Sequence, residues 1–291
     1  MKGSFAIIGC GRAGLSFTKF LYKAGYPPAG LSSRSLQSAN LAAEIIGFKG
    51  KVSTKPWEVL GDADIVLITT PDHVIREIAE KIAGYGGMKP GVKVFHCSGA
   101  LSSDELSALK GANAKTGSIH PLQSFGSHDS EINPFKGIMV GIEGDRECVD
   151  AAWQMAKDLG ATPFEIQTSG KMLYHAAAVV ASNYLVTLLK FAIDLLGASG
   201  VESDNRFEIL KPLIMGTLSN IENAGAEEAL TGPIRRGDTA VVRAHLEAIE
   251  ESSPDMSALY KKLGEYTVEI AYSGKSISSD IRDELLSILT E

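Results

Sequence analysis

A glycine-rich turn near the N-terminus constrains the fold more than any other feature of this chain. Residues 5–8 are apolar, and their length and β-branched content predict a buried strand. Gly9, Gly11 and Gly14 follow at the spacing Gly-x-Gly-x-x-Gly, and apolar residues then recur at helical spacing through residue 21. The glycines therefore lie where a strand turns into a helix, which is the context that the dinucleotide-binding fingerprint requires.

Each glycine of the fingerprint has its own physical role. Gly9 permits the tight turn, Gly11 lets the backbone approach a pyrophosphate, and Gly14 lets the helix pack close to the strand. The first helical turn, with Arg12 and Ala13, offers free N–H groups and a positive dipole end to the phosphates. The alternative is a glycine-rich turn that merely connects two elements, but the strand and helix around it favour a nucleotide site.

The next predicted strand, at residues 29–33, indicates which dinucleotide is bound. Arg34 follows it, 20 residues past Gly14 (34 − 14 = 20), where NAD-binding sites usually place an acid for the ribose 2′-hydroxyl. This chain has Ser33, Arg34 and Ser35 instead, and a guanidinium flanked by hydroxyls suits a 2′-phosphate. We therefore predict NADP(H); a solvated surface arginine in a polar turn is the alternative.

Composition and charge argue against several classes of function. The 291 residues are 44% hydrophobic and 22% charged, as in ordinary soluble proteins, and suffice for two domains. The net charge of −7 and the lack of a basic stripe argue against a nucleic-acid partner. Cys10, Cys97 and Cys148 are scattered and fit a reducing compartment, and no secretion signal precedes the first strand, so we expect a cytoplasmic protein.

Strands and helices alternate through the first 168 residues. Beyond the first two, strands are predicted at 64–70, 92–97, 115–119, 137–142 and 162–167, with helices at 36–46, 72–82 and 146–159 and a helix capped by Ser102 or Ser103. The run at 64–70 is nearly continuous in apolar residues, which is typical of a parallel strand covered on both faces. The alternation predicts an α/β fold with a doubly wound, mostly parallel sheet.

The pattern changes after residue 168, and no convincing strand follows. Helical periodicity covers 170–198, 203–225, 235–250, 254–273 and 278–290. We therefore predict an α/β domain at 1–168 and an all-helical domain at 169–291. The helix at 170–198 is apolar almost all round, as in a buried helix, and its polar interruptions, Asn183 and Lys190 among them, argue against a membrane span.

The glycine-rich turn, the serines around Arg34 and the helical second half together resemble the 6-phosphogluconate dehydrogenase-like superfamily. It includes pyrroline-5-carboxylate reductase, ketopantoate reductase, 3-hydroxyisobutyrate dehydrogenase and prephenate dehydrogenase. Within it, the chain resembles in particular the family that joins a Rossmann-like domain to DUF2520. The residues that carry this resemblance are 96–100, 120–122, 175–178, 182–183 and 232–238.

The resemblance implies a Rossmann-type domain followed by a helical domain like the C-terminal domain of 6-phosphogluconate dehydrogenase. It implies an NADP(H)-dependent oxidoreductase that moves a hydride to or from a small carbonyl, imine or alcohol carbon between the domains. A prephenate or arogenate dehydrogenase-like enzyme and a non-catalytic NADP-binding sensor are the alternatives. The apolar surface of 172–197 exceeds what a short bundle covers, so we expect a homodimer through the helical domain. The family leaves the substrate open.

Ligands of open α/β sheets lie beyond the carboxyl ends of the strands. Thr70 and Pro71 end one predicted strand and should line the cofactor site. Ser98 follows the next strand, where its hydroxyl could bond the nicotinamide amide or the substrate. A turn serine or a helix-capping serine is an equally good interpretation of Ser98.

His120 follows the predicted strand at 115–119 and precedes Pro121. With Ser98 upstream, it resembles the arrangement in prephenate and arogenate dehydrogenases, in which a serine and a histidine flank the reacting hydroxyl. A histidine can give or take a proton near neutral pH. A structural histidine bonded to the backbone is the alternative.

Lys171 and His175 begin the long predicted helix, and their spacing of four places them on one face. By resemblance, ketopantoate reductase and 3-hydroxyisobutyrate dehydrogenase use a lysine here with an asparagine four residues on, where this chain has His175. Asn183 lies about two turns further along the same side. We predict these three residues, with Ser98 and His120, as catalytic groups. A solvated lysine and a satisfied buried histidine are the alternatives.

Two further sequence features, Arg235 and the residues around His96, give weaker indications of function. Arg235 could clamp a substrate carboxylate, but an ion pair with Asp238 that fixes the surrounding turn is the favoured interpretation. His96, Cys97 and His120 lack the ligand spacing typical of zinc, so we expect no metal site.

Overall fold

The computed structural model describes residues 2–123, 125 and 131–290. The chain forms two compact units, Met1–Ala181 and Ser182–Glu291, and each is described by itself. The long helical segment that begins at Lys171 runs through this division. The predicted boundary between residues 168 and 169 lies just before that segment and stays a prediction.

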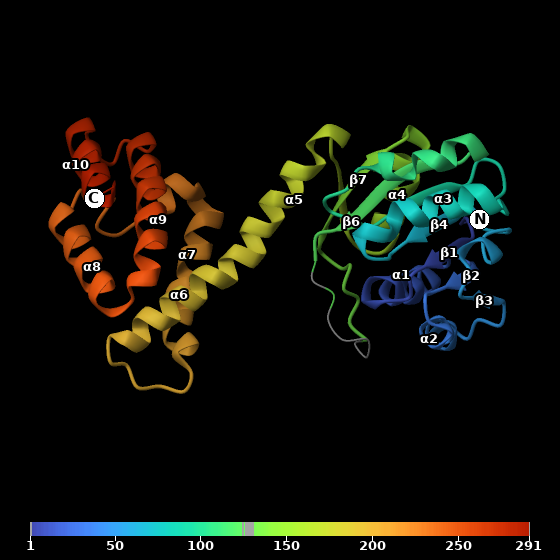
Figure 1. The fold of residues 1–291 in the computed structure, drawn as a ribbon, viewed down its shortest axis with the longest axis horizontal. Helices are drawn as coiled ribbons and strands as arrows, with labels where there is room; N and C mark the ends of the chain where they lie inside the picture. The colour runs from blue at the N-terminus through green and yellow to red at the C-terminus, as the bar shows by residue number, and fades with distance from the viewer. Residues whose placement is uncertain (1, 124, 126–130, 291) are drawn as a thin grey trace. The chain divides into compact units, whose positions relative to one another are not determined.

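The first unit is built on a sheet of eight strands among the described residues, in the order β3-β2-β1-β4-β5-β6-β7-β8 (Figure 1). The strands are β1 (Phe5–Ile8), β2 (Pro28–Ser32), β3 (Lys51–Ser53), β4 (Ile65–Ile68), β5 (Lys93–His96), β6 (Lys115–Pro121), β7 (Met139–Gly144) and β8 (Thr162–Glu165). Neighbouring strands are parallel except for β6 and β7, which are antiparallel. The prediction of a doubly wound, mostly parallel sheet is confirmed.

Helices cover both faces of the sheet. The α-helices of this unit are α1 (Arg12–Lys23), α2 (Leu36–Ile46), α3 (Ile75–Tyr85), α4 (Arg146–Asp158) and α5 (Lys171–Val179), and the 3₁₀ segments are η1 (Pro56–Glu58), η2 (Asp72–Val74), η3 (Ser103–Ala112) and η4 (Thr168–Gly170). Phe5 and Ile7 of β1 pack in one core with α1, α2 and α4, whereas Ala6 and Ile8 pack in another with α3 and η3. This division follows from the two-residue side-chain period of a strand.

The strand order marks the carboxyl ends of β1 and β4 as the expected ligand-binding edge of the sheet. β1 lies between β2 and β4, so the chain connections diverge there, and open α/β sheets bind ligands at such a point. The amide of Gly9 donates to the Ser32 carbonyl (2.7 Å), and the amide of Thr69 donates to the Ile8 carbonyl (2.8 Å). These bonds hold the three strand ends β2, β1 and β4 in register beside the glycine-rich turn.

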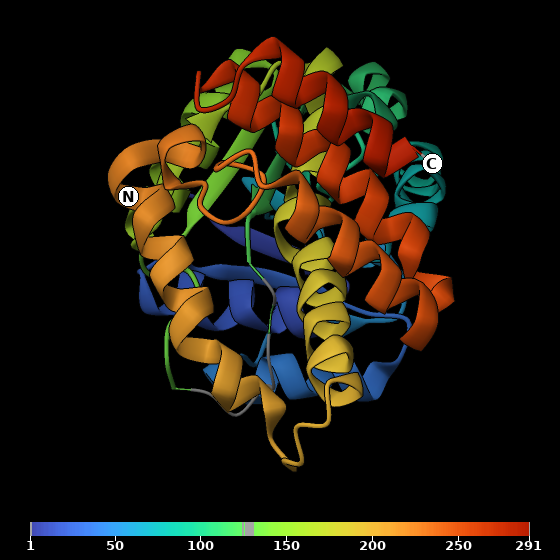
Figure 2. The ribbon, with the colours of Figure 1, turned by 90° about the vertical axis from the view of Figure 1, so that its left-hand side faces the viewer.

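The second unit contains helices, and no strand, among its described residues. Its helices are α6 (Leu185–Ala198), α7 (Arg206–Ala229), α8 (Thr239–Ser252), α9 (Pro254–Ser273) and α10 (Ser279–Thr290). The last three pack together around an apolar core that includes Val242, Val268 and Leu285 (Figure 2). α7 is kinked at Gly225, where φ is +81° and ψ is 168°.

The long apolar segment is exposed within a single chain. It consists of α5, a π-helical turn (Val180–Tyr184) and α6, and only Lys171 and Phe191 in these elements are buried, although the sequence predicts a buried helix. Residues Thr168–Ala198 are long and apolar enough to cross a membrane by length and composition, which is weak evidence for a membrane span.

Candidate functional site

The glycine-rich turn has a geometry that only glycines allow. Gly9 has a φ of +104°, in the left-handed region that favours glycine. A Cβ atom on Gly14 would lie 1.9 Å from the Gly9 carbonyl oxygen, so α1 could not start this close to β1. A Cβ on Gly11 would meet no atom within 4 Å. The space beside Gly11 is therefore open for a ligand to approach the backbone.

The N-terminus of α1 faces this space without a cap. Gly11 is the N-cap residue, Arg12 and Ala13 open the helix, and no side chain accepts from the first amides. The first turn contains no acidic residue. Uncapped N–H groups and the positive end of the helix dipole attract anions, so the turn suits a pyrophosphate.

The residues predicted to recognise the ribose follow β2. Arg34 is exposed, and the Ser33 hydroxyl accepts a hydrogen bond from the Cys10 amide (3.4 Å). Ser35 caps α2, because its hydroxyl accepts from the Ser38 amide (3.3 Å). Both serine hydroxyls therefore bond to the backbone, while the Arg34 guanidinium is open to solvent beside the turn.

Thr70 and Pro71 follow β4 at the same edge of the sheet. The Thr70 hydroxyl oxygen is buried and has no hydrogen-bond partner in the described part of the chain. Its neighbour Thr69, which the sequence did not single out, donates its hydroxyl to the Gly9 carbonyl (2.5 Å). A buried hydroxyl without a partner is uncommon, and a ligand bound at this edge of the sheet would satisfy it.

A row of buried polar side chains crosses the sheet on the next three strands. The strand register pairs His96 of β5 with Ser118 of β6, and Ser118 with Glu143 of β7. Directly paired residues point to the same face of a sheet, so these three side chains lie side by side. All three are buried, and buried polar groups need partners inside the protein.

His96 is held in one neutral form. Its Nδ1 atom accepts from the Ser98 amide (3.2 Å), so Nε2 carries the proton and donates to the Ser102 carbonyl (2.9 Å). Burial lowers the pKa of His96. Both ring nitrogens are engaged, so His96 is a structural residue that shapes the loop after β5.

Ser98 lies in that loop with its hydroxyl engaged within the chain. The hydroxyl donates to the Asp72 carboxylate (2.7 Å) and accepts from the amides of Ala100 (3.2 Å) and Leu101 (3.0 Å). A serine hydroxyl has one proton to donate, and here Asp72 takes it. The geometry therefore favours the turn-forming role of Ser98.

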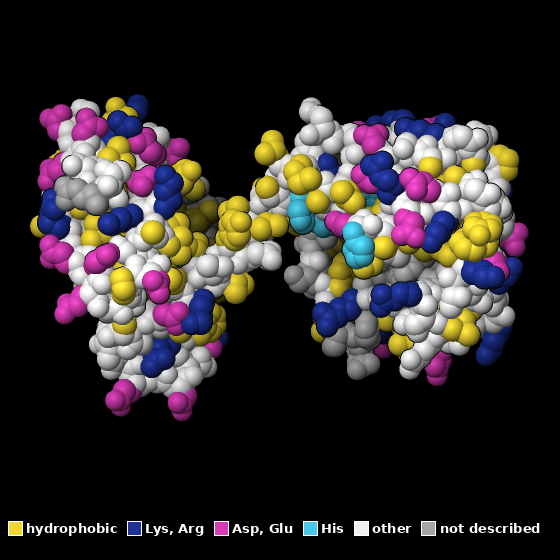
Figure 3. Space-filling model, in the orientation of Figure 1, with side chains coloured by type: hydrophobic (Ala, Val, Ile, Leu, Met, Phe, Trp, Pro, Cys, Tyr) yellow, Lys and Arg dark blue, Asp and Glu magenta, His cyan; other side chains and the backbone are white. Residues whose placement is uncertain are grey.

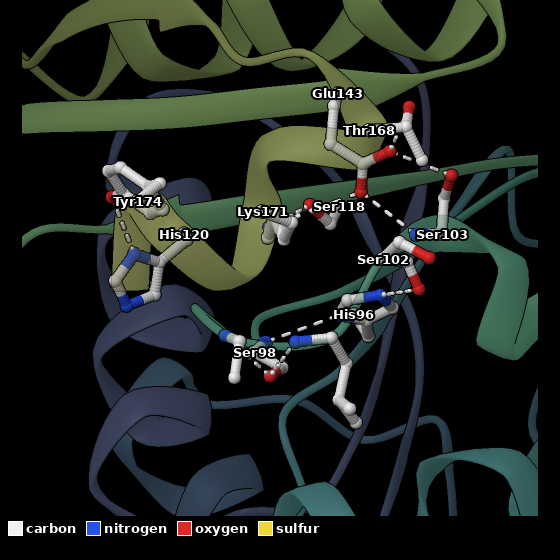
Figure 4. A network of polar contacts seen from close by, with 12 residues as sticks. His96, Ser98, Ser102, Ser103, Ser118, His120, Glu143, Thr168, Lys171 and Tyr174 are labelled. Atoms are coloured by element: carbon white, nitrogen blue, oxygen red, sulfur yellow. Dashed lines mark hydrogen bonds and ion pairs between the residues drawn. The ribbon is translucent and has the colours of Figure 1, made fainter. Parts of the chain in front are cut away.

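Lys171 lies inside the polar row rather than on the surface. Its side chain is 2% exposed, and Nζ donates to the Ser118 hydroxyl and lies 4.0 Å from the Glu143 carboxylate (Figure 4). Glu143 also accepts from the Ser103 amide (2.9 Å) and from the hydroxyls of Ser103 (2.8 Å) and Thr168 (3.0 Å). Burial lowers the pKa of Lys171 to about 8, and the Glu143 charge opposes that shift.

His120 and His175 meet beside the polar row. A Cβ on Gly99 would lie 2.8 Å from His120 Nε2 and 2.7 Å from His175 Nδ1, so the two nitrogens lie close together at this glycine. His175 Nδ1 is buried and has no hydrogen-bond partner among the described residues. His120 Nδ1 lies 2.7 Å from the Tyr174 hydroxyl.

The surroundings hold His120 and Tyr174 in their neutral forms. Burial lowers the pKa of His120 to about 4, and the charges of Lys171 and His175 lower it further. Burial raises the pKa of Tyr174 to about 12. At neutral pH the pair is therefore an uncharged imidazole bonded to an uncharged phenol.

Four of the five predicted catalytic residues lie in the first unit, and the fifth belongs to the second. Ser98, His120, Lys171 and His175 all belong to the first unit. Asn183 is exposed, belongs to the second unit and lies in the π-helical turn. That turn interrupts the 3.6-residue period on which the expectation of a shared face rests.

The sequence analysis did not identify several residues of the candidate site, namely Asp72, Ser103, Ser118, Glu143 and Tyr174. Glu143 had a usable signal, because it is the only acid in the otherwise apolar β7 strand. The serines and Tyr174 had none, since nothing in their local sequence distinguishes them from surface residues.

Two further predictions concern Arg235 and metal ions. The expected pairing of Arg235 with Asp238 is wrong. Arg235 donates to the carbonyls of Glu228 and Leu230 (both 2.7 Å) and pairs with the Glu228 carboxylate (3.3 Å), whereas Asp238 caps α8. No group of three or more His, Cys, Asp or Glu side chains among the described residues could hold a metal ion.

Comparisons with known proteins agree with this architecture. Residues 2–121 match the Rossmann-like domain, and residues 138–267 match DUF2520, a domain of unknown function. No curated protein matches the chain in sequence.

Solved structures of similar fold cover nearly the whole chain. A protein from Thermotoga maritima is 27% identical, with 93% of this chain and 99% of that chain covered and a TM-score of 0.73. A candidate NADP oxidoreductase from Bacteroides fragilis is 24% identical, with 92% and 98% covered and a TM-score of 0.71. An imine reductase from Pseudomonas sp. is 17% identical, with 96% and 100% covered and a TM-score of 0.68.

The first matched range spans β1 to β6, and the second begins at β7 and ends within α9. Together they account for most of the chain. The chain therefore joins a Rossmann-like domain to a DUF2520 domain.

Proposed function

We propose that the protein is an NADP(H)-dependent oxidoreductase that moves a hydride to or from the carbon of a small carbonyl, imine or alcohol. One observation carries the proposal: a single edge of the sheet holds both an open glycine-rich turn and a cluster of buried proton-exchanging side chains. Gly9 and Thr70 follow β1 and β4, while Ser98 follows β5 and His120 lies near the end of β6. Parallel strands bring their carboxyl ends to one edge, which is where ligands of such sheets bind.

The residues around the turn fit a dinucleotide. The uncapped amides of α1 would hold the pyrophosphate, the open face of Gly11 would admit it, and the unpartnered Thr70 hydroxyl would bond the ligand. The cofactor would supply the hydride, and the protein would supply orientation and proton exchange. The likeness in fold to an NADP oxidoreductase and an imine reductase supports this assignment.

Arg34 is the basis for proposing NADP(H) over NAD(H). Its guanidinium is exposed directly after β2, where an acid would otherwise bond the ribose 2′-hydroxyl. A planar guanidinium binds a phosphate through two parallel hydrogen bonds. The Ser33 hydroxyl beside it accepts from the Cys10 amide and has one proton of its own to donate.

The two histidines are the groups best placed to contact the reacting heteroatom. His120 Nε2 has no partner in the described chain, His175 Nδ1 has none either, and both reach the same place at Gly99. In reduction, the hydride would add to carbon, the π electrons would move to the heteroatom, and that atom would take a proton from His175. Lys171 would contribute only indirectly, from within the sheet, because its ammonium group is already bound to Ser118 and Glu143.

Calorimetry with NADPH and NADH, followed by NADPH oxidation over panels of carbonyls, imines and 2-oxo acids, tests the proposal. NADPH should bind more tightly than NADH, and Arg34→Asp should reverse the preference. His120→Gln and His175→Gln should lower turnover by about 10²-fold or more, within the usual range for general acid–base groups, with His73→Gln on the exposed η2 segment as the control. Failure to bind either cofactor would exclude the function, and tight binding without any turnover would favour the sensor.

We further propose that the protein is a cytoplasmic homodimer whose helical units associate through α6 and α7. Exposed apolar side chains on these helices include Val186, Leu188, Ile209, Leu213, Met215 and Leu218. Hydrophobic side chains also gather over the exposed long helical segment in Figure 3. A surface of this kind is stable in water when a second copy covers it.

An ion pair favours a protein partner over a lipid surface. Lys190 and Asp194 bond at 2.5 Å on the exposed part of α6, and burying both charges in a bilayer would cost several kcal/mol. Sedimentation at micromolar concentration should give a dimer without detergent. Val186→Glu should dissociate it, while Lys190→Gln should not. A monomer, or a protein that needs detergent to stay in solution, would overturn the homodimer.

A further inference from the structure

We infer that Tyr174 is a positioning residue: its hydroxyl fixes the orientation and the tautomer of His120, so that a proton stands on Nε2. The inference rests on the proposed function for its catalytic meaning, but its structural content can be tested without any substrate. It starts from the 2.7 Å distance between the Tyr174 hydroxyl and His120 Nδ1, which Figure 4 shows as a direct contact between α5 and β6.

The sheet is shaped to hold the Tyr174 ring in place. Gly141 of β7 pairs with His120 in the strand register, and a Cβ on Gly141 would lie 3.1 Å from the Tyr174 hydroxyl. Phe164 of β8 meets the ring edge-on, with centroids 5.9 Å apart, and His120 meets it at 85° with centroids 5.6 Å apart. The phenol therefore enters a space left by a glycine and is packed from two sides.

The direction of the hydrogen bond follows from elementary chemistry. A phenol is a strong donor and a weak acceptor, whereas the unprotonated nitrogen of a neutral imidazole is a strong acceptor. Tyr174 is protonated and His120 is neutral at pH 7, since burial raises the pKa of Tyr174 to about 12 and lowers that of His120 to about 4. The phenol donates to Nδ1, and the single ring proton is left on Nε2.

The tautomer decides what His120 can do at the reacting atom. With a proton on Nε2, the neutral ring donates a hydrogen bond to the carbonyl oxygen or imine nitrogen and draws electron density from the carbon. A neutral histidine can polarise a substrate in this way without giving up its proton. With the proton on Nδ1, the same ring would present a lone pair and repel the heteroatom. Tyr174 thus selects the electrophilic form of His120.

The chain provides a matched control in its second unit. His245 Nδ1 lies 2.8 Å from the Tyr260 hydroxyl, and those rings also meet at 85°. Tyr174→Phe and Tyr260→Phe each delete one oxygen atom from one tyrosine–histidine pair. Any effect of losing such a pair in general would appear in both variants.

Nitrogen-15 spectroscopy of the imidazole rings tests the inference on the cofactor-free protein at pH 7, with His120→Gln used to assign the signals. In the unmutated protein, His120 should show a protonated Nε2 and a hydrogen-bonded Nδ1. In Tyr174→Phe, the Nδ1 signal should move toward that of a nitrogen without a hydrogen bond, and a second tautomer should become populated. Tyr260→Phe should leave the His120 signals unchanged.

An unchanged His120 spectrum in Tyr174→Phe, or a proton on Nδ1 in the unmutated protein, would overturn the inference whether or not the protein is an oxidoreductase. Once a substrate is known, Tyr174→Phe should lower kcat about tenfold with KM and NADPH affinity unchanged. Equal losses in kcat for both tyrosine variants would also contradict a specific role. Absence of all turnover would count against the proposed function alone.

Discussion

The ammonium group of Lys171 lies 4.0 Å from the carboxylate of Glu143, and the two side chains are only 2% and 1% exposed. Two opposite charges so deeply buried are costly to desolvate, and the cost is offset only when hydrogen bonds surround both. Ser118, Ser103 and Thr168 provide those bonds. The pair ties the start of α5 to the sheet, and α5 also carries Tyr174 and His175.

Removing one partner of this pair should destabilise the first unit. Glu143→Gln keeps the size of the side chain but removes its charge, so Lys171 would stay buried without compensation. The free energy of unfolding should fall by about 3–5 kcal/mol in urea titrations at pH 7. Glu147→Gln, which breaks the solvent-exposed pair with Lys115, should lower the free energy of unfolding far less, because water screens exposed ion pairs. Equal losses of unfolding free energy in both variants would contradict a buried, charged pair of Lys171 and Glu143.

The lowered pKa of Lys171 should appear in the pH dependence of stability. Its pKa falls from 10.5 to about 8 in the folded chain. Between these values the unfolded state binds more protons than the folded state, so the contribution of Lys171 to stability rises with pH. Relative to Lys171→Met, the unmutated protein should therefore gain stability from pH 8 to 10.5, by at most about 3 kcal/mol.

Chemical denaturation at several pH values across this window gives that difference. Lys190→Met, which removes an exposed lysine of α6, serves as the control and should show no such rise. If the difference in free energy of unfolding between the unmutated protein and Lys171→Met stays constant from pH 8 to 10.5, Lys171 is not desolvated in solution.

Substitutions at two glycines of the turn should distinguish a loss of NADPH binding from a loss of folding stability. Gly11→Val places its side chain in open space, so the thermal unfolding temperature of the cofactor-free protein should change little while NADPH binding is lost. Gly14→Ala forces a Cβ to within 1.9 Å of the Gly9 carbonyl oxygen and should lower that temperature. Calorimetry for binding and a thermal melt for stability measure both effects. NADPH binding retained in Gly11→Val would remove the turn from the site.

Gly99 should be required for the geometry of the two histidines. In Gly99→Ala the new methyl group would lie within 2.8 Å of both rings, so at least one must move. A displacement of about 1 Å at a reacting group can cost 10²-fold in rate, and we expect turnover to fall by about that factor. NADPH affinity should stay within about twofold. Gly84→Ala, in an open position on α3, is the control.

The sheet was predictable because its strands carry local signals. Buried parallel strands such as β4 are continuous apolar runs, and a strand-turn-helix pattern marks the glycine-rich turn. β3 was missed because Lys51–Ser53 is short and has no apolar pattern of its own, and it pairs at the edge only because β2 is there. The cap predicted for η3 also failed in detail. Ser102 holds the cap position without a side-chain cap bond, and Ser103 donates to Glu143 instead.

The candidate site was only partly predictable, because its residues come from several segments that lie far apart in the sequence. His120, Lys171 and His175 stood out by residue type and position, and the structure places all three in the first unit. Glu143 and Tyr174 became recognisable only when the register of β6 and β7 and the start of α5 placed them beside Ser118 and His120.

The amino-acid sequence by itself determined the elements, the fingerprint turn and the residue types that can exchange protons, since each depends on neighbours within a few positions. The tertiary structure alone decided which polar groups share a face, which are neutral and which remain without a partner. Those properties depend on burial and on contacts between strands far apart in the chain. Lys171 shows the difference: its local sequence allows a solvated lysine, but packing against Ser118 and Glu143 buries it and lowers its pKa to about 8.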